Sequence, residues 1–333
     1  MATTITGTTI DVGPNKLVAN SAGNVTASGN VTASGVLSDP SGNVRAGRKN
    51  LIINGSAMVS QRGSYTSATT IQNASYFLDR FRFQNSVVTG TVQHTSISLN
   101  GVNKKAIKVA ATSTGTGYLI LQQTVEFQSI QVGENYTVSC WVRSNNANTR
   151  FRQNTFRATS EDGTAFTNDG NWEKVSWTFS STGTTGSPTI NIAMYNNANV
   201  SISNGDYFEI TELQLETGSV ATDFEHRSYG EELQLCQRYF EIPYFGNTAA
   251  SRWSGADWVG SVSFAVTKRV VPTMSFSGLL KVWGDGSVAD ATLFTNWDIN
   301  VTGFGLRAQG GHGNAAAVFY GQSTAVCKAD AEL

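Results

Sequence analysis

The residues of this sequence that are best suited to chemistry are aromatic and acidic side chains that can bind sugars. Trp253 and Trp258 bracket a Ser-Gly-Ala-Asp stretch that is typical of a loop. Sugar rings place their C–H faces against flat aromatic rings, while amides and carboxylates fix the hydroxyl groups. Because binding residues are often carried on loops, Trp253, Asp257 and Trp258, together with Tyr244, are the predicted ligand-binding residues.

The tryptophans also have a purely structural interpretation. Four of the seven, Trp253, Trp258, Trp283 and Trp297, fall within 45 residues of the C-terminal part. We expect most of them to fill a core or an interface between subunits. Trp283 and Trp297 stand inside strand-like patterns and are assigned to the core, which leaves Trp253 and Trp258 as candidates for the surface.

Residue patterns for catalysis are missing from the sequence. It contains no His-Glu-x-x-His motif, P-loop, nucleophile elbow or dinucleotide fingerprint. The three histidines, His94, His226 and His312, are isolated, and the acidic stretch around His226 is interpreted as a polar connector into a helix. Glycoside cleavage needs two positioned carboxylates, and no pair stands out among the acidic residues. The sequence therefore indicates a protein that is not an enzyme.

Metal binding has only weak candidates. Jelly-roll domains that bind sugar can hold a structural calcium through carboxylates and carbonyls, and Asp79, Glu209, Glu212 and Asp223 lie near expected strand ends. Their spacing is not diagnostic, so no cofactor is predicted beyond the option of a structural calcium.

The three cysteines, Cys140, Cys236 and Cys327, are odd in number and far apart. They form neither a metal-type pair nor a disulfide framework, and they are expected to be reduced thiols packed as small hydrophobic residues. This indicates synthesis in a reducing cytoplasm.

Composition predicts a mostly β fold. Only 14 % of the 333 residues are charged, against roughly 25 % in ordinary soluble proteins. Small, β-branched and turn-forming residues take their place, which favours many short strands. A net charge of -1 argues against nucleic acid as a partner. Apolar runs are too short to span a bilayer, and the first residues lack the features of a secretory signal, so no membrane insertion is expected.

Residues 1–49 contain no aromatic side chain and include a tandem repeat, GNVTAS at 23–28 and again at 29–34. One valine per repeat buries too little area to offset the backbone entropy of ordering, about 1–2 kcal/mol per residue. The arm is either a flexible linker or an intertwined shaft, and the regular Val and Thr spacing favours the shaft. In a shaft, three copies of the chain would bury Val25, Val31, Val36 and Leu37 around a common axis.

The remainder of the chain predicts two β domains separated by a helix. Segment 51–53 is expected to be a short buried strand that ends at the Asn54-Gly55 turn. Eight or nine strands over 50–227 suit a double-sheet jelly roll. Ser228 and Glu231 form a capping-box pattern, which predicts a helix over 229–241 within a linking segment, 228–241. Residues 242–333 are expected to form a smaller β-sandwich at the tip of the molecule.

Several segments resemble bacteriophage tail-fibre proteins. Segments 50–63 (NLIINGSAMVSQRG) and 76–81 (YFLDRF) look like the opening of a jelly-roll module that is similar to carbohydrate-binding modules. Segment 213–228 (LQLETGSVATDFEHRS) resembles the last strand and exit of that module. Segments 231–241 (EELQLCQRYFE) and 328–333 (KADAEL) resemble the helix and the ending of predicted phage fibres.

The resemblance implies a host-facing virion component, made in the host cytoplasm, that works as a homotrimer. Its partners would be copies of itself, another virion protein held through residues 1–49, and a host surface glycan or lipopolysaccharide. Two alternatives stay open: a capsid-decorating head fibre or architectural adaptor without receptor binding, and a depolymerase of envelope polysaccharide. Polysaccharide-cleaving phage spikes usually carry long parallel β-helices, for which neither expected domain has the length.

Overall fold

The structure is a computed structural model that describes most of the chain. The described residues are 9–11, 16–19, 25–27, 38–39, 42–43, 49–156, 160–182, 188–196, 198–246, 248–255, 257–284, 287–291, 293–309, 316–319 and 325–332. The chain divides into two units, Met1–Gly47 and Arg48–Leu333.

The first unit contributes short strands whose backbone alone is described. Strands β1 (Thr9–Asp11), β2 (Lys16–Ala19) and β3 (Val25–Ala27) form an antiparallel sheet, and β4 (Ser38–Asp39) pairs with β5 (Gly42–Asn43). The backbone of Val25 lies in β3, whereas Val31, Val36 and Leu37 lie outside the described residues. The trimeric shaft therefore stays a prediction.

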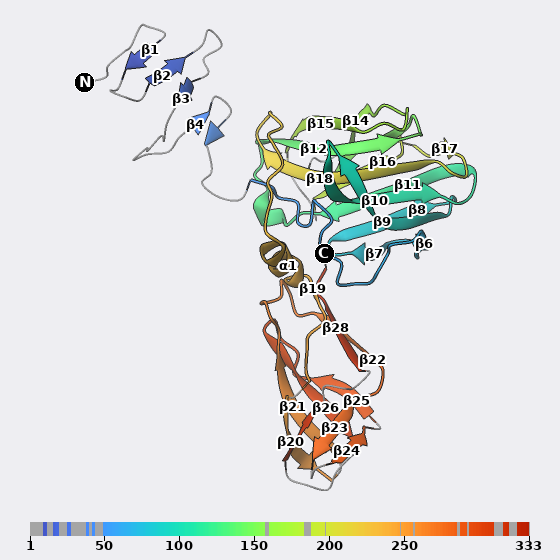
Figure 1. Ribbon diagram of the computed structural model, residues 1–333, viewed down its shortest axis with the longest axis vertical. Helices are drawn as coiled ribbons and strands as arrows, with labels where there is room; N and C mark the ends of the chain where they lie inside the picture. Colours follow the sequence, from blue (N-terminus) through green and yellow to red (C-terminus); the bar gives the residue numbers. More distant parts are fainter. Residues whose placement is uncertain are drawn as a thin grey trace. The chain divides into compact units, whose positions relative to one another are not determined.

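A β-sandwich of the jelly-roll type follows, built from two sheets (Figure 1). Sheet I has the order β15-β12-β18-β10-β9-β6, and sheet II has the order β14-β13-β16-β11-β8-β7, with β17 paired to β11. The strands of sheet I are β6 (Thr69–Thr70), β9 (Gly90–Leu99), β10 (Val102–Ala111), β12 (Asn135–Ser144), β15 (Glu173–Ser180) and β18 (Tyr207–Thr217). The strands of sheet II are β7 (Ser75–Leu78), β8 (Phe81–Ser86), β11 (Gly115–Thr124), β13 (Thr149–Asn154), β14 (Glu161–Ala165), β16 (Thr189–Met194) and β17 (Val200–Ile202). A single 3₁₀ turn, η1 (Phe127–Ser129), follows β11 in this part of the described chain.

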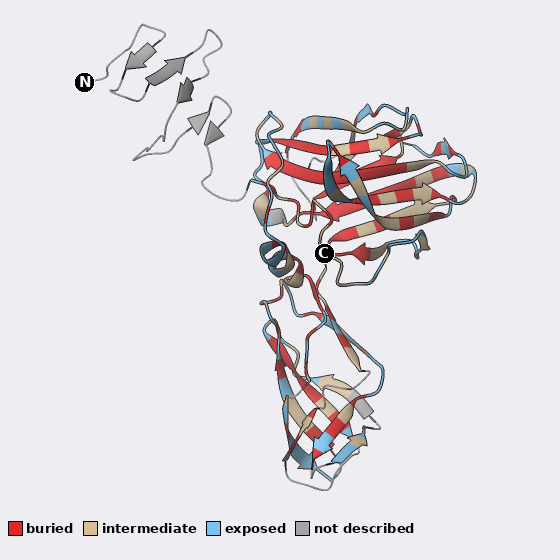
Figure 2. Ribbon diagram, in the orientation of Figure 1, coloured by how far each residue is buried: buried red, intermediate tan, exposed pale blue. Residues whose placement is uncertain are grey.

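The core of the sandwich follows from alternation along the strands. In β12, Tyr136, Val138, Cys140 and Val142 all face inward and are buried in one apolar cluster. Because side chains of a strand point alternately to its two faces, the residues between them lie on the outer face. Figure 2 shows the buried stripes that result in both sheets.

The opening of the sandwich corrects one expectation. Residues 51–53 form no strand, and the backbone N–H of Leu51 makes an isolated hydrogen bond to Leu215 O at 2.8 Å. The turn after them is confirmed: Asn54 has φ +62°, and a Cβ on Gly55 would lie 2.0 Å from Leu213 O. This close approach of backbone to β18 explains why glycine is needed there.

Helix α1 (Tyr229–Gln237) begins as the sequence predicts and ends earlier. The Ser228 side chain accepts from the Glu231 N–H, and Glu231 returns the bond to the Ser228 N–H, so the capping box is confirmed. The expected helical end at 241 is wrong, because Phe240 and Glu241 instead form β19 and pair with the C-terminal strand β28.

The C-terminal domain has its own core and two sheets. Strands β19 (Phe240–Glu241), β28 (Val326–Asp330) and β22 (Thr273–Ser277) form the smaller one. The larger one, sheet III, has the order β24-β23-β27-β20-β21-β26-β25. Its strands are β20 (Ala249–Ser254), β21 (Asp257–Ser263), β23 (Lys281–Gly284), β24 (Ser287–Asp290), β25 (Leu293–Trp297), β26 (Gly303–Gln309) and β27 (Ala316–Phe319). Both sheets contribute to a second apolar cluster, separate from that of the sandwich.

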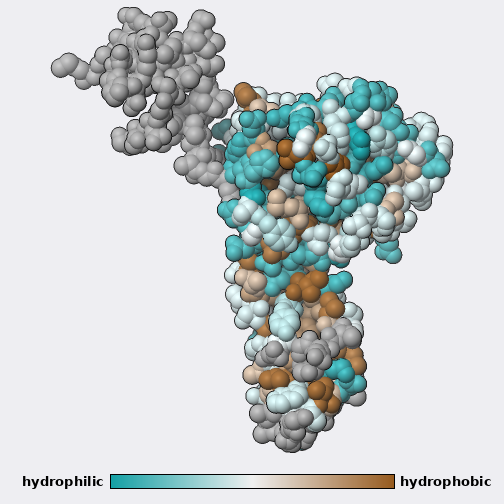
Figure 3. Space-filling model, in the orientation of Figure 1, coloured by the Kyte–Doolittle hydropathy of each residue, from teal (hydrophilic) through white to brown (hydrophobic). Residues whose placement is uncertain are grey.

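The surfaces of the two domains differ in character. Most of the large apolar side chains that are exposed belong to the C-terminal domain, among them Tyr244, Trp253, Val271, Trp283 and Trp297. In Figure 3 the visible face of the sandwich is mostly hydrophilic, whereas hydrophobic patches occur over the C-terminal strands. The exposed apolar side chains of the described residues are therefore concentrated in the C-terminal domain.

Candidate functional site

The predicted tryptophan site is corrected by burial. Trp258 lies in β21 with 0 % exposure, inside the core of the C-terminal domain, so its indole is closed to a ligand. The assignment of Trp283 and Trp297 to the core is also wrong, because they are 43 % and 46 % exposed. Both lie in strands as expected, but on the face of sheet III that points away from the core, and the alternation of one strand does not say which face is covered.

The other three predicted residues differ in their accessibility. Trp253 is 71 % exposed, and the structure places it beside Trp297 with ring centroids 6.2 Å apart. Asp257 is nearly buried and receives a hydrogen bond from Arg307 Nη2 at 2.7 Å. Tyr244 is exposed, but it does not line the pocket that Trp253 shares with Trp297.

The predicted metal ligands are not brought together. Asp79 accepts hydrogen bonds from the Gln61 backbone and side chain, and burial raises the pKa of its carboxyl. Glu209 is bonded by Arg143, and Glu212 by Lys104. Asp223 has a fully exposed side chain. Within the described residues, no group of three or more His, Cys, Asp and Glu side chains is placed to hold a metal ion.

The three cysteines are confirmed as free and buried. Burial raises the pKa of all three thiols, that of Cys327 to about 12, so they stay protonated and unreactive at neutral pH.

The outer face of sheet II carries a site that sequence reasoning missed. Cross-strand register aligns one polar row over five strands, with each residue directly opposite the next: Arg82, Gln122, Asn191, Arg152 and Asp162. Directly opposed residues of antiparallel strands share a face. Their strand neighbours Leu121, Ile192 and Phe151 belong to the core cluster, so the row lies on the other face of the sheet. Gln122 and Asn191 in the middle of the row are themselves buried. A polar row of this kind, drawn from distant parts of the chain, is invisible to any short sequence motif.

Two tyrosines stand beside this row and are fixed by it. Tyr118 and Tyr195 meet edge to face, with ring centroids 6.0 Å apart at 82°. The guanidinium of Arg152 lies over the Tyr195 ring, 4.6 Å from its centroid, and forms an ion pair with Asp162. We call Tyr118, Tyr195, Arg152 and Asp162 the tyrosine platform. The ion pair is only 11–12 % exposed, so it holds the rings in place, whereas both tyrosines remain half-buried at the surface.

The electrostatics of this face are also defined. Arg82, Arg150 and Arg152 lie on the same face of these strands as Asp162. Three arginine charges and one carboxylate charge leave this part of the face with a surplus of two positive charges. The second oxygen of that carboxylate, Oδ2, is buried without a hydrogen-bond partner. A buried acceptor without a donor is costly, and a ligand hydroxyl is the kind of group that would satisfy it.

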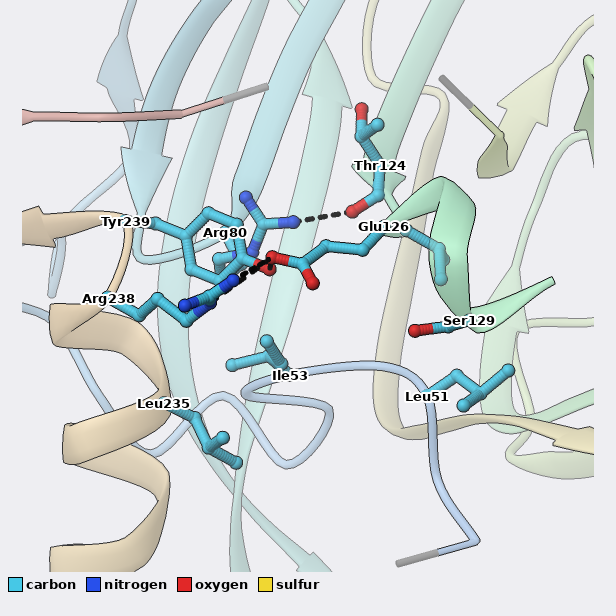
Figure 4. Close-up of a pocket in the computed structure, with 10 residues that line it drawn as sticks. Leu51, Ile53, Arg80, Thr124, Glu126, Ser129, Leu235, Arg238 and Tyr239 are labelled. Atoms are coloured by element: carbon cyan, nitrogen blue, oxygen red, sulfur yellow. Dashed lines mark hydrogen bonds and ion pairs between the residues drawn. The ribbon is translucent and has the colours of Figure 1, made fainter. Parts of the chain in front are cut away.

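A separate pocket at the base of the sandwich has a structural role (Figure 4). It has a volume of about 140 Å³ and lies between η1 and the end of α1. Glu126 Oε1 accepts hydrogen bonds from Tyr239 Oη at 2.8 Å and from Arg238 Nη2 at 3.0 Å. The guanidinium of Arg80 lies 3.6 Å from the centroid of the Tyr239 ring and donates a hydrogen bond to Thr124 O. Burial raises the pKa of Tyr239 to about 12. These polar groups are engaged with one another, so the pocket fastens the helix to the sandwich.

The same joint includes the end of the chain. Arg62 and Arg80 both pair with Glu332, and Arg62 also pairs with Asp330 at 3.0 Å. Arg62 is stacked over Phe240 as well, 3.9 Å from the ring centroid. The last strand of the C-terminal domain is therefore fastened to the sandwich by a charged network that is mostly buried.

Comparison with known proteins gives likeness of structure only. No family model matches the chain, and no curated protein matches it. Among solved structures, the chain is similar to the enzymatically active domain of tailspike protein 4 from bacteriophage CBA120 (13 % identity, TM-score 0.34). The similarity covers 50 % of this chain and only 21 % of that one.

Carbohydrate-binding modules are also among the similar structures. A family 11 module from Clostridium thermocellum, solved with a β-1,3-1,4-mixed-linked tetrasaccharide, is 16 % identical over 46 % of this chain and 98 % of the module, with a TM-score of 0.28. A xylan-binding domain from Paenibacillus barcinonensis is 12 % identical over 48 % and 99 %, with a TM-score of 0.28. These values assign neither an activity nor a ligand to this chain. None of the described helices is long and apolar enough to cross a membrane.

Proposed function

We propose that this chain is a glycan-binding subunit of a virion fibre that attaches a tailed phage to the host surface. The observation that carries the proposal is the tyrosine platform of sheet II. The Arg152 guanidinium covers one face of the Tyr195 ring, and the other face is the flat, rigid surface that we propose for the C–H face of a sugar. Because the ring is already held, little side-chain entropy remains to be lost on binding.

The polar groups around the platform supply the second element of sugar recognition. Gln84 lies in the row next to the polar row and donates a hydrogen bond to Gln122 Oε1 at 3.0 Å. Asp162, whose Oδ2 has no hydrogen-bond partner, belongs to the polar row itself. Sugar hydroxyls both donate and accept hydrogen bonds, so they match such a mixed set. The surplus of two arginine charges favours a polysaccharide that carries carboxylates.

Binding without cleavage is the favoured form of this function. Hydrolysis of a glycosidic bond uses two carboxyl groups, about 5–9 Å apart, on either side of the bond. Asp162 is the single carboxylate in the cross-strand row of the described face. A depolymerase would need a second one from elsewhere.

Placement in a fibre rests on the sequence of the arm and on the resemblance of segments 213–228 and 231–241 to phage fibres. The repeats of residues 23–34 have too few apolar side chains to order alone, so we propose that three chains complete the arm. Three identical sandwiches on one particle would multiply weak contacts with a repetitive surface glycan.

Affinity electrophoresis of the full chain tests the glycan-binding proposal. The gels would contain alginate or polygalacturonate as acidic polymers, and xylan or mixed-linkage glucan as neutral ones. We expect retardation in at least one acidic gel and its loss in Tyr195→Ala. The control is Tyr207→Ala, which removes a tyrosine with a similar cation contact, Lys108 at 4.6 Å, from the opposite sheet. Equal retardation of the wild type and Tyr195→Ala, or no retardation in any gel, would contradict the proposal.

The position on the particle has its own test. Gold-labelled antibody against the full chain should decorate tail fibres of intact virions. Labelling of the capsid would assign the chain to a head fibre, and absence of labelling would remove it from the virion.

A further inference from the structure

The C-terminal domain has an open pocket of about 250 Å³ that the tyrosine platform does not use. It is lined by Trp253, Val259, Trp297 and Arg307. These residues come from β20, β21, β25 and β26, which are neighbours in sheet III. Val259 pairs directly with Arg307, so the floor of the pocket is a continuous piece of sheet.

Two indole rings form the walls of this pocket. The planes of Trp253 and Trp297 are inclined at 47°, so the rings form two adjoining walls of one concave surface. Trp297 pairs with Gly305, and a Cβ on that glycine would lie 2.2 Å from Trp297 Nε1. The five-membered ring of the indole therefore lies directly over the glycine, where a side chain would collide with it, while the rest of Trp297 stays partly exposed.

Arg307 is the polar residue that lines the pocket, and its partner Asp257 has spare hydrogen-bonding capacity. Arg307 donates to Asp257 Oδ2 at 2.7 Å, while the other oxygen, Oδ1, is buried without a partner. Asp257 as a whole is only 8 % exposed, although it stands on the ligand side of the sheet. An unpartnered acceptor of this kind is rarely left in a folded protein, and it marks a place where a donor is expected.

We propose that this pocket is a second carbohydrate site, which binds one neutral hexose unit of a surface glycan. Sites for drug-sized ligands have volumes of roughly 300–1,000 Å³, so a pocket below that range suits a single sugar ring better than an extended chain. The two indoles take the C–H face of the ring, and the Arg307–Asp257 pair bonds its hydroxyl groups. Because the arginine charge is cancelled by its partner, an acidic sugar gains no net attraction.

This site goes beyond the proposed function, because it would act independently of the tyrosine platform. The platform belongs to the sandwich and suits an acidic polymer, whereas the pocket belongs to the other domain and suits a neutral ring. A chain with both would recognise two features of one host surface. The failure of one site leaves the other in place.

The test is a titration of the full chain labelled with 5-fluorotryptophan, followed by ¹⁹F NMR. The probes are methyl α- and β-hexopyranosides of glucose, galactose and mannose, compared with methyl glucuronide and methyl galacturonide. We expect the signals of Trp253 and Trp297 to shift with at least one neutral glycoside, at a concentration about tenfold lower than with either acidic one.

Three variants make the titration specific. Trp297→Ala removes a wall, and Gly305→Ala keeps both indoles but drives the Trp297 ring off its support; each should weaken binding about tenfold or more. Trp283→Ala is the matched control, because it removes an equally exposed tryptophan of the same sheet outside the pocket, and it should bind as the wild type does.

Several outcomes would overturn the proposal. These are the absence of shifts with every glycoside, tighter binding of the acidic probes, or unchanged binding in both Trp297→Ala and Gly305→Ala. Sedimentation of the same variants covers the remaining alternative. If Trp297→Ala dissociates a multimer and no sugar shifts the signals, the indoles belong to a subunit interface and the proposal is wrong. Retardation by acidic polymers through the tyrosine platform would be unaffected by any of these results.

Discussion

Replacement of Trp258 by alanine should selectively destabilise the C-terminal domain. The side chain is fully buried in the core of that domain. A buried tryptophan removes about 200 Å² from water, which at about 25 cal/mol per Å² is worth about 5 kcal/mol. Its Nε1–H has no partner in the core, so removal of the ring also relieves an unsatisfied donor worth about 1 kcal/mol. The expected loss in the free energy of unfolding is therefore about 3–5 kcal/mol, in the range measured for large-to-small changes in cores.

Guanidinium denaturation of the full chain measures this loss. Because the two domains have separate cores, amide hydrogen exchange measured by mass spectrometry can show which domain loses stability. The backbone amides of β21 and β26 should exchange faster in the variant, while those of β12 and β16 should exchange as in the wild type. Trp253→Ala is the matched control, since an exposed tryptophan should change the free energy of unfolding by less than about 0.5 kcal/mol. If Trp258→Ala costs less than about 1 kcal/mol, or costs no more than Trp253→Ala, the assignment of these two indoles to core and surface is refuted.

Three further changes have defined outcomes. Burial, aided by the charge of Lys105, lowers the pKa of His94, so the folded state resists protonation of this residue. The free energy of unfolding should be highest above pH ~6.5 and fall as the pH drops below it. In urea titrations at several pH values, His94→Leu should reduce this dependence on pH, whereas an unchanged dependence would contradict the prediction. Although burial acts in the opposite direction, hydrogen bonds from Tyr239 and Arg238 lower the pKa of Glu126. Glu126→Gln should therefore speed exchange of the α1 amides near neutral pH, and this effect should disappear once the pH is low enough to protonate the carboxylate of the folded protein. Ser228→Ala removes the helix cap and should cost about 1 kcal/mol by thermal unfolding, with an unaltered midpoint counting against the cap.

Local patterns of the sequence predicted where several elements begin, but they did not fix where the helix ends or whether residues 51–53 form a strand. The capping box of Ser228 and Glu231 is a short-range signal, and the helix begins where it predicts. The end of that helix depends on pairing between Phe240 and the distant strand β28, which no local pattern contains. Strand alternation likewise predicted β12 and its buried side chains, because one face of that strand is apolar throughout.

The candidate sites were harder to predict because they depend on contacts between distant strands. Trp258 and Trp297 both occur in alternating strands, and only the closure of sheet III decides which one is covered. The tyrosine platform joins Tyr118, Arg152 and Tyr195 through registers that span more than 70 residues, and no spacing along the chain encodes them. The glycine that supports Trp297 resembles any other glycine of a strand until the facing ring is known.

Hydroxyl-radical footprinting of the full chain tests glycan binding by the tyrosine platform most directly. It compares the chain alone with the chain bound to the acidic polysaccharide that slows its migration most in affinity electrophoresis. Oxidation of Tyr118 and Tyr195 should fall when the polymer is present, because both rings face the ligand, while oxidation of Tyr207 on the opposite sheet should not change. Protection of Tyr207 together with unchanged oxidation of Tyr118 and Tyr195 would contradict glycan binding by sheet II.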